Sequence, residues 1–128
     1  LSRCEIYIVT DHSEAVGYAM LNWSPKYSLY KRLEIPEIQD LNISPEFRQR
    51  GLASQLVEFC ENKVKEAGKD QIGISVGLYK DYGPAQRLYI KRGYVPDGNG
   101  IAYNRQTVTA GEIYPVDDDL CLMFVKDL

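Results

Sequence analysis

Asp40–Ala67 reads DLNISPEFRQRGLASQLVEFCENKVKEA, and in it a short apolar strand leads into a long amphipathic helix. The junction, Arg48–Ala53, combines two arginines with two small residues. The first turn of a helix has backbone N–H groups without intrahelical partners, and the helix dipole adds partial positive charge there. Gly51 and Ala53 leave those donors uncovered, so a large anion can approach the backbone. The stretch therefore predicts a cradle for a diphosphate.

The two commonest phosphate-binding loops do not fit this cradle. No Lys-Ser or Lys-Thr follows Gly51, and the chain has no Gly-x-Gly-x-x-Gly. The sequence therefore argues against a nucleoside-triphosphate loop and against a dinucleotide-binding turn.

The helix after the cradle has one apolar face and ends at Gly68, which suits a left-handed cap. The residues expected on the apolar face recur at steps of three and four: Leu52, Leu56, Phe59 or Cys60, Val64 and Ala67. The residues expected on the polar side are Glu58, Glu61, Lys63, Lys65 and Glu66.

Upstream of the cradle the pattern predicts an antiparallel hairpin of strands 4–10 and 15–23. His12 lies in the hairpin loop and is expected to be a solvated turn residue. Residues 24–33 have no clear period and are expected to form a loop or a strand extension. A third strand is expected over 35–43. Its alternation fails between Ile38 and Leu41, which predicts a β-bulge.

Downstream, residues 71–76 read as a short buried strand, joined to the third strand by a right-handed crossover. A second helix is expected over 83–91, followed by a loop at 96–100 and short β-like pieces over 101–116. Residues 120–125 form a final apolar strand. Asp117, Asp118 and Asp119 are expected in a solvated turn, because their spacing lacks the features of a metal loop.

The composition fits one domain over residues 1–128, with a formal net charge of −3. That charge does not favour bulk nucleic-acid binding, and no apolar run is long enough for a membrane helix. Cys4, Cys60 and Cys121 form neither a zinc pattern nor a disulfide framework. A reducing, cytoplasmic location is therefore expected.

Two motifs together resemble the signatures of the GNAT superfamily of N-acetyltransferases. Arg48, Gly51 and Ala53 fill its acetyl-coenzyme A motif, Gln/Arg-x-x-Gly-x-Gly/Ala. Residues 82–94 resemble its second signature, Asn-x-x-Ala-x-x-Leu-Tyr-x-x-x-Gly-Phe, through Ala85, Leu88, Tyr89, Gly93 and Tyr94. Tyr82 replaces the usual Asn and Tyr94 the usual Phe, so one polar contact to the cofactor is in doubt.

The resemblance implies an α+β fold (α/β mixed), with a central twisted mixed sheet flanked by helices. The strand and two helices that usually open the family's fold are expected to be missing before Cys4. Either a front segment was lost, or a second copy in a homodimer covers that face. The resemblance also implies acetyl-CoA as co-substrate and no metal. The cofactor-binding residues it implies are Leu41, Asn42, Ile43, Arg48, Gln49, Arg50, Gly51, Leu52, Ala53, Ser54, Tyr82, Ala85 and Tyr89.

The implied reaction is direct attack of a primary amine on acetyl-CoA in a ternary complex. Tyr89 is the predicted acid for the departing thiolate, because a phenol can donate a proton to a thiolate within hydrogen-bond reach. Glu37 is the predicted base, with Asp40 or water as alternatives. The acceptor is a small-molecule or protein amine, and the acidic balance favours a cationic one. The alternative hypothesis is a non-catalytic acyl-CoA-binding regulatory module.

Overall fold

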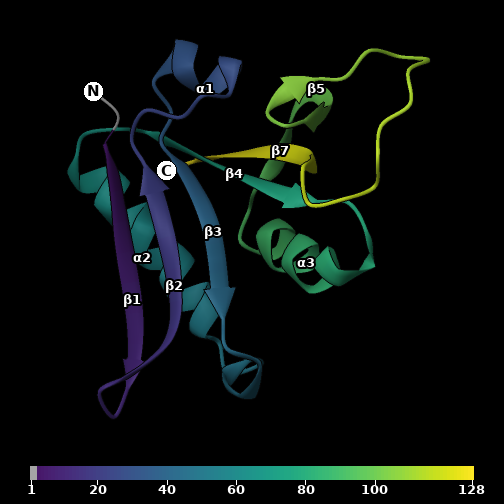
Figure 1. The fold of residues 1–128 in the computed structure, drawn as a ribbon. Helices are drawn as coiled ribbons and strands as arrows, with labels where there is room; N and C mark the ends of the chain where they lie inside the picture. Colours follow the sequence, from purple (N-terminus) through teal and green to yellow (C-terminus); the bar gives the residue numbers. More distant parts are fainter. Residues whose placement is uncertain (1–2) are drawn as a thin grey trace.

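The computed structural model describes residues 3–128, where seven strands form one mixed sheet in the order β1-β2-β3-β4-β7-β5-β6. Figure 1 shows the sheet with its helices. The elements are β1 (Cys4–Asp11), β2 (Glu14–Asn22), α1 (Ser28–Leu33), β3 (Glu37–Ile43), α2 (Leu52–Glu66), β4 (Gln71–Gly77), α3 (Gly83–Lys91), β5 (Val95–Tyr103), β6 (Gln106–Thr107) and β7 (Leu120–Asp127). Short 3-10 turns at Pro45–Phe47 and Lys80–Tyr82 precede α2 and α3. The predicted α+β class is confirmed.

β3 and β4 are neighbours in the sheet for only a short distance. Their parallel register joins Glu37 to Gly73 and Ile38 to Ile74, and no further pair follows. Beyond this point the two strands diverge, with β3 running down and β4 running to the right in Figure 1. This divergence creates an opening at the C-terminal ends of both strands, in the middle of the sheet.

The divergence coincides with the predicted β-bulge. β2 pairs with β3 through Met20 with Gln39 and Tyr18 with Asn42, so β3 has one residue more than β2 in this interval. Asp40 lies inside it with φ = 54°, a left-handed conformation that turns the chain out of the regular ladder. The bulge predicted between Ile38 and Leu41 is therefore confirmed.

α2 lies behind β1, β2 and β3 in the view of Figure 1 and covers that face of the sheet. Its buried residues are Leu56, Val57, Cys60, Glu61 and Val64. Gly68 follows the helix with φ = 83°, as predicted. The bond from the Lys69 amide to the Val64 carbonyl, 3.2 Å, closes the last turn. Phe59, one of the two alternatives for the apolar face, is largely exposed and packs edge-on against Tyr7 at the rim.

The prediction that Glu61 belongs to the polar side of α2 was wrong. Glu61 is only 5% exposed, and its carboxylate accepts hydrogen bonds from Arg92, Tyr94 and Lys126 at 2.8, 2.8 and 3.1 Å. Burial by itself raises the pKa of Glu61, but these three partners outweigh burial and lower it. The ion cluster links α2 to the end of α3 and to β7, which sequence periodicity cannot reveal.

The region 24–33 is not a loop throughout, because it contains α1. Tyr30 of α1 is fully buried, its ring lies against Gly73, and its hydroxyl donates to the Phe124 carbonyl at 2.5 Å. A Cβ added at Gly73 would lie 2.4 Å from that ring. The helix is too short to be stable alone, so its packing on the sheet determines it. Glu34 ends it with φ = 56°.

Residues 96–100 were predicted as a loop, but they lie within β5. The pairing of β5 with β7 is interrupted between Pro96 and Ile101. Pro96 pairs with Phe124 and Ile101 with Leu122, so four residues of β5 lie opposite one residue of β7. Gly98 and Gly100 have positive φ, which explains why the sequence shows turn chemistry there. None of the helices within residues 3–128 has the length and hydropathy needed to cross a membrane.

We expect Glu61→Gln to lower the free energy of unfolding by about 2 kcal/mol at neutral pH, because charge-assisted hydrogen bonds are lost. The folded-state pKa of Glu61 lies below its ordinary value, so the stabilisation is complete above the unfolded-state pKa. It is lost as pH falls through the folded-state pKa, and the two proteins should then converge in acid. Urea unfolding at neutral and acidic pH measures this. The exposed Glu58→Gln on the same helix is the control, and a loss as large in Glu58→Gln would contradict the assignment.

Candidate active site

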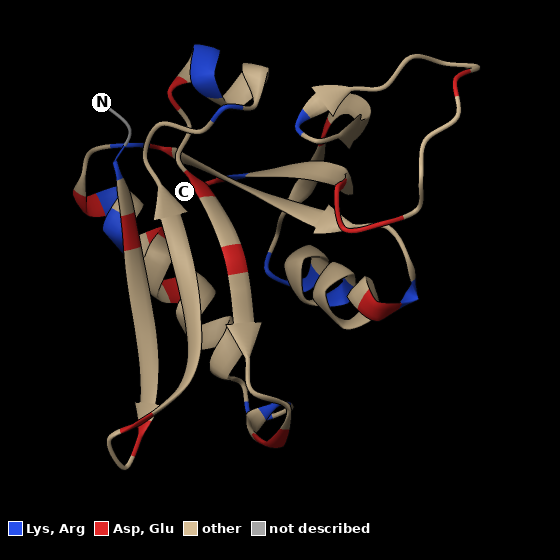
Figure 2. Ribbon diagram, viewed as in Figure 1, with Lys and Arg blue, Asp and Glu red and all other residues tan. Residues whose placement is uncertain are grey.

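The opening between β3 and β4 continues into a cleft of about 810 Å³. Its walls are the bulged end of β3, the first turn of α2, the end of β4, one side of α3 and the segment leading into β7. In Figure 2 the acidic stretch before β7, drawn red, lies above the start of α3. The cleft is therefore built from segments on both sides of the divergence.

Nearly all residues predicted to hold the cofactor line this one cleft. They are Leu41, Asn42, Ile43, Arg48, Gln49, Gly51, Leu52, Ala53, Ser54, Tyr82, Ala85 and Tyr89. Arg50 is the exception: it is exposed, and its guanidinium carbon lies 4.9 Å from the centre of the Phe47 ring. The structure thus brings the two sequence motifs together, while the role of each residue stays a prediction.

The first turn of α2 forms an open wall of the cleft. Gly51 precedes the helix with φ = 78°, and no atom lies within 4 Å of the position a Cβ would take. Gln49 also has a positive φ, 62°, so the backbone turns sharply before the helix. The Nε of Arg48 donates to the Ile43 carbonyl at 2.9 Å and ties this turn to the end of β3. Such a turn leaves amide N–H groups available to an anion.

Tyr89 lies on α3 and is only 5% exposed, although it borders the cleft. Burial raises the pKa of Tyr89 to about 12. Its ring packs against Tyr94 with a centroid distance of 6.1 Å. The cleft is therefore bordered by a phenol that keeps its proton at neutral pH.

The structure separates the two carboxylates proposed as base. Glu37 is fully buried and does not line the cleft, whereas Asp40 is exposed in the bulge and does. Glu37 accepts hydrogen bonds from Gln39 at 3.1 Å and from Arg105 at 2.7 Å. Burial raises the pKa of Glu37, and the charge of Arg105 opposes that effect. Direct contact between Glu37 and a substrate in the cleft would require this pairing to change.

Sequence reasoning missed several residues of the cleft. Arg105 reaches it from the β5–β6 turn, and Asp118 accepts hydrogen bonds from the hydroxyls of Tyr79 and Tyr82 at 2.5 and 2.8 Å. Tyr82 packs over Gly77, where an added Cβ would lie 2.3 Å from its ring. The sequence suggests a solvated turn for the aspartate triplet, with a possible attraction for a cationic substrate, but not the contacts of Asp118 with Tyr79 and Tyr82. Nothing local marks Arg105, because its partner Glu37 is distant in sequence.

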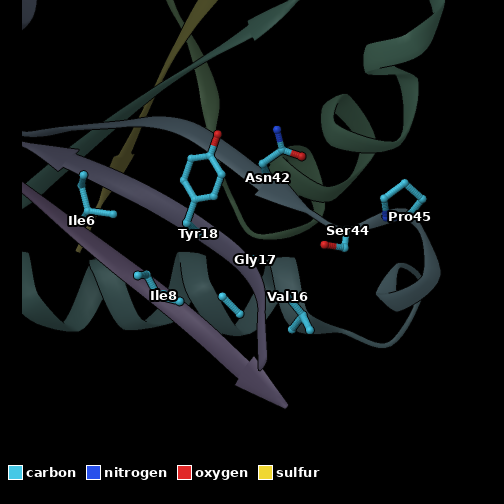
Figure 3. A pocket seen from close by; sticks show the side chains of 9 residues that line it. Ile6, Ile8, Val16, Gly17, Tyr18, Asn42, Ser44 and Pro45 are labelled. Carbon is cyan, nitrogen blue, oxygen red and sulfur yellow. The ribbon is translucent and has the colours of Figure 1, made fainter. Parts of the chain in front are cut away.

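A second hollow, of about 470 Å³, lies on the β1–β2 hairpin next to the end of β3. Figure 3 shows Ile6, Ile8 and Tyr18 on one face of this hairpin, with Asn42 beside them. No charged side chain lines this hollow. Within residues 3–128, no group of three or more His, Cys, Asp and Glu side chains is arranged to hold a metal ion. The large central cleft is therefore the candidate active site.

Comparison with protein families agrees with this geometry. The family model described as "Acetyltransferase (GNAT) domain" matches residues 2–96, which include the bulge, the cradle and α3. The chain belongs to the GNAT acetyltransferase family. Both motifs identified in the sequence lie inside the matched range, the first at the start of α2 and the second in and beside α3.

One curated relative is the aminoalkylphosphonate N-acetyltransferase of Salmonella typhimurium. It is 29% identical over 83 residues, which are 65% of this chain and 51% of the relative. The chain thus spans about half the length of the curated relative it matches.

Solved structures share the GNAT fold. A GNAT family acetyltransferase from Elizabethkingia anophelis, solved with acetyl-CoA bound, matches with a TM-score of 0.72 and 19% identity over 98% of this chain and 76% of that one. The PaiA N-acetyltransferase from Thermoplasma acidophilum, in complex with coenzyme A, matches with a TM-score of 0.64 and 13% identity over 98% and 61% of the two chains. At these identities the likeness supports the fold alone.

Proposed function

We propose that this protein is an N-acetyltransferase that transfers the acetyl group of acetyl-CoA to a primary amine by direct attack in a ternary complex. The observation that carries this proposal is that the α2 cradle and Tyr89 border one cleft, which opens where β3 and β4 part. The name of the curated relative, an aminoalkylphosphonate N-acetyltransferase, supports an amine as acceptor.

In this proposal the diphosphate of acetyl-CoA binds at the first turn of α2. The amides around Gly51 and Ala53 would donate to it, and the charge of Arg48 would add attraction. The pantetheine arm would lie between β3 and β4, where backbone groups of the bulge have no ladder partner. The Leu41 amide would polarise the thioester carbonyl, because negative charge develops on that oxygen during attack.

The chemical step needs one base and one acid. The amine must lose a proton to expose its lone pair, and its nitrogen then bonds to the acetyl carbon as the carbon–sulfur bond breaks. The leaving thiolate would take the proton of the Tyr89 hydroxyl. Glu37 remains the proposed base and would act through water, since its carboxylate is outside the cleft lining. Asp40 is the alternative, because it borders the cleft.

A non-catalytic acyl-CoA-binding module is the competing function. It would use the same cradle but would need no proton donor near the thioester. Release of free thiol from acetyl-CoA in the presence of an amine panel, measured beside coenzyme A binding, separates the two. Binding without thiol release for every amine would favour the module.

We expect Gly51→Glu to weaken coenzyme A binding by more than about 100-fold, because a carboxylate would face the diphosphate in a strained backbone position. Isothermal calorimetry measures the affinity. Gly111→Glu is the matched control, since Gly111 also has positive φ and open space but lies outside the cleft. If Gly51→Glu bound coenzyme A with wild-type affinity, the first turn of α2 would not be the diphosphate site.

We expect Tyr89→Phe to lower kcat by roughly 100-fold or more and to leave coenzyme A affinity nearly unchanged, because only the proton donor is removed. The pKa of about 12 for Tyr89 means that its deprotonation should not limit activity at neutral pH. Steady-state kinetics and calorimetry measure the two effects. Tyr114→Phe removes a hydroxyl outside the cleft and serves as control. An unchanged kcat in Tyr89→Phe would remove this residue from the mechanism.

We expect activity to rise with pH through the pKa of Glu37, which burial raises above its ordinary value, because a base must be ionised to accept a proton. Glu37→Gln should lower kcat and abolish that acidic limb of the pH profile, whereas Asp40→Asn should retain it. Profiles of kcat/KM for both variants measure this. Loss of the limb in Asp40→Asn alone would transfer the role of base to Asp40.

A further inference from the structure

Arg105 occupies an unusual backbone position. The turn between β5 and β6 consists of Asn104 and Arg105, with φ of 49° and 62°. Two-residue hairpin turns of this kind require positive φ at both positions, and glycine is the residue that adopts the second one without strain. An arginine held there against its preference is the kind of outlier that points to a function of the side chain.

The side chain of Arg105 is held by a buried carboxylate. Its Nη2 donates to Glu37 at 2.7 Å, and Glu37 is fully buried while Arg105 remains 31% exposed. Gln39 donates to the other Glu37 oxygen at 3.1 Å and fixes the carboxylate. Glu37 does not reach the cleft, but Arg105 does. The pair therefore presents a guanidinium to the cleft in a fixed orientation.

The Arg105 guanidinium has N–H donors that Glu37 does not use. Its Nε is buried and has no hydrogen-bond partner within residues 3–128. Such a group costs free energy unless a partner is supplied. Arg92 also has a buried Nε without a partner, but Arg92 is outside the cleft lining and serves the Glu61 cluster. Arg105, unlike Arg92, lines the cleft, and only one of its guanidinium nitrogens, Nη2, is bonded to Glu37.

The cleft lining carries charges of both signs. Four carboxylates line it: Asp40, Asp81, Asp118 and Asp119. Arg48 is the other cation of the lining, and its Nε is already bonded to the Ile43 carbonyl at the end of β3, beside the α2 cradle. An ammonium would be attracted by the carboxylates, while an oxyanion finds free donors at Arg105. This arrangement suits a molecule that carries both charges.

We propose that Arg105 is a specificity-determining residue that binds an anionic group of the acceptor, so that the preferred substrate is a small zwitterionic amine. The inference rests on the proposed acetyl transfer and names its substrate class. A planar guanidinium matches a carboxylate, phosphonate or sulfonate through paired N–H donors. Glu37 keeps the guanidinium in place without consuming all of its donors.

The test compares acceptors of one chain length that differ in the group opposite the amine. β-Alanine, 2-aminoethylphosphonate and taurine carry an anion, ethanolamine is neutral and ethylenediamine is cationic. We expect kcat/KM of the wild-type protein to be at least about tenfold higher for one of the anionic amines than for ethanolamine. Comparison among the three identifies which oxyanion is bound. A preference for ethylenediamine, or no preference, would overturn the proposal.

Arg105→Gln should reduce the ratio of kcat/KM between the preferred anionic amine and ethanolamine to about one, because the fork that binds the oxyanion is lost. Arg105→Lys keeps a charge beside Glu37 and should lower the ratio less. An equal fall for all acceptors would overturn the proposal, because it would mean that Arg105 acts only through Glu37. If Arg105→Gln fails to fold, the test rests on Arg105→Lys alone. An unchanged ratio of kcat/KM in that variant would show that Arg105 does not bind the anionic group.

The matched control is Arg87→Gln, which removes an arginine from the exposed side of α3, outside the cleft, and should leave the ratio unchanged. If Arg87→Gln changed the ratio of kcat/KM as much as Arg105→Gln does, the effect would come from the net charge of the protein. That result would also overturn the proposal. Failure of the proposed acetyl transfer would give a different result, because the wild-type protein would then acetylate none of the amines.

Discussion

The short contact between β3 and β4 determines where the central cleft of this protein opens. Two residue pairs, Glu37 with Gly73 and Ile38 with Ile74, join the strands, and the bulge at Asp40 then turns β3 away. Backbone N–H and C=O groups that would have continued the ladder are left at the rim of a cleft. Because unpaired polar groups are costly when buried, a cleft of this kind is suited to a ligand that offers hydrogen bonds along its length.

The rest of the structure keeps that opening from closing. Glu61, buried at the middle of α2, binds Arg92 and Lys126, so α2, α3 and β7 are held at fixed positions around the cleft. Arg92 also donates to Ser54 at 3.0 Å in the first turn of α2, which connects the cradle to the end of α3. On the other face, Tyr30 fastens α1 to β4 and β7. These contacts are expected to hold the cleft open before a substrate enters.

The two ends of the cleft differ in their chemistry. At the α2 end, backbone amides and Arg48 suit a diphosphate, whereas near α3 the buried Tyr89 offers a neutral proton donor. Between β3 and the β5–β6 turn, a buried carboxylate holds Arg105 toward the cleft. In the reaction that we propose, these separate regions of one cleft would position the thioester, the amine and the oxyanion of the acceptor.

The amino-acid sequence by itself determined the features that depend on neighbours along the chain. The small residues at Gly51 and Ala53, the helix over 83–91 and the break in alternation before Leu41 all follow from local geometry, and all appear where the sequence predicts them. Only the tertiary structure decided the burial of Glu61, the helix at Ser28–Leu33 and the pairing of Glu37 with Arg105. These depend on groups 31 to 68 positions apart, or on a sheet face that stabilises a helix too short to form alone, so their free energy comes from contacts that no local pattern records.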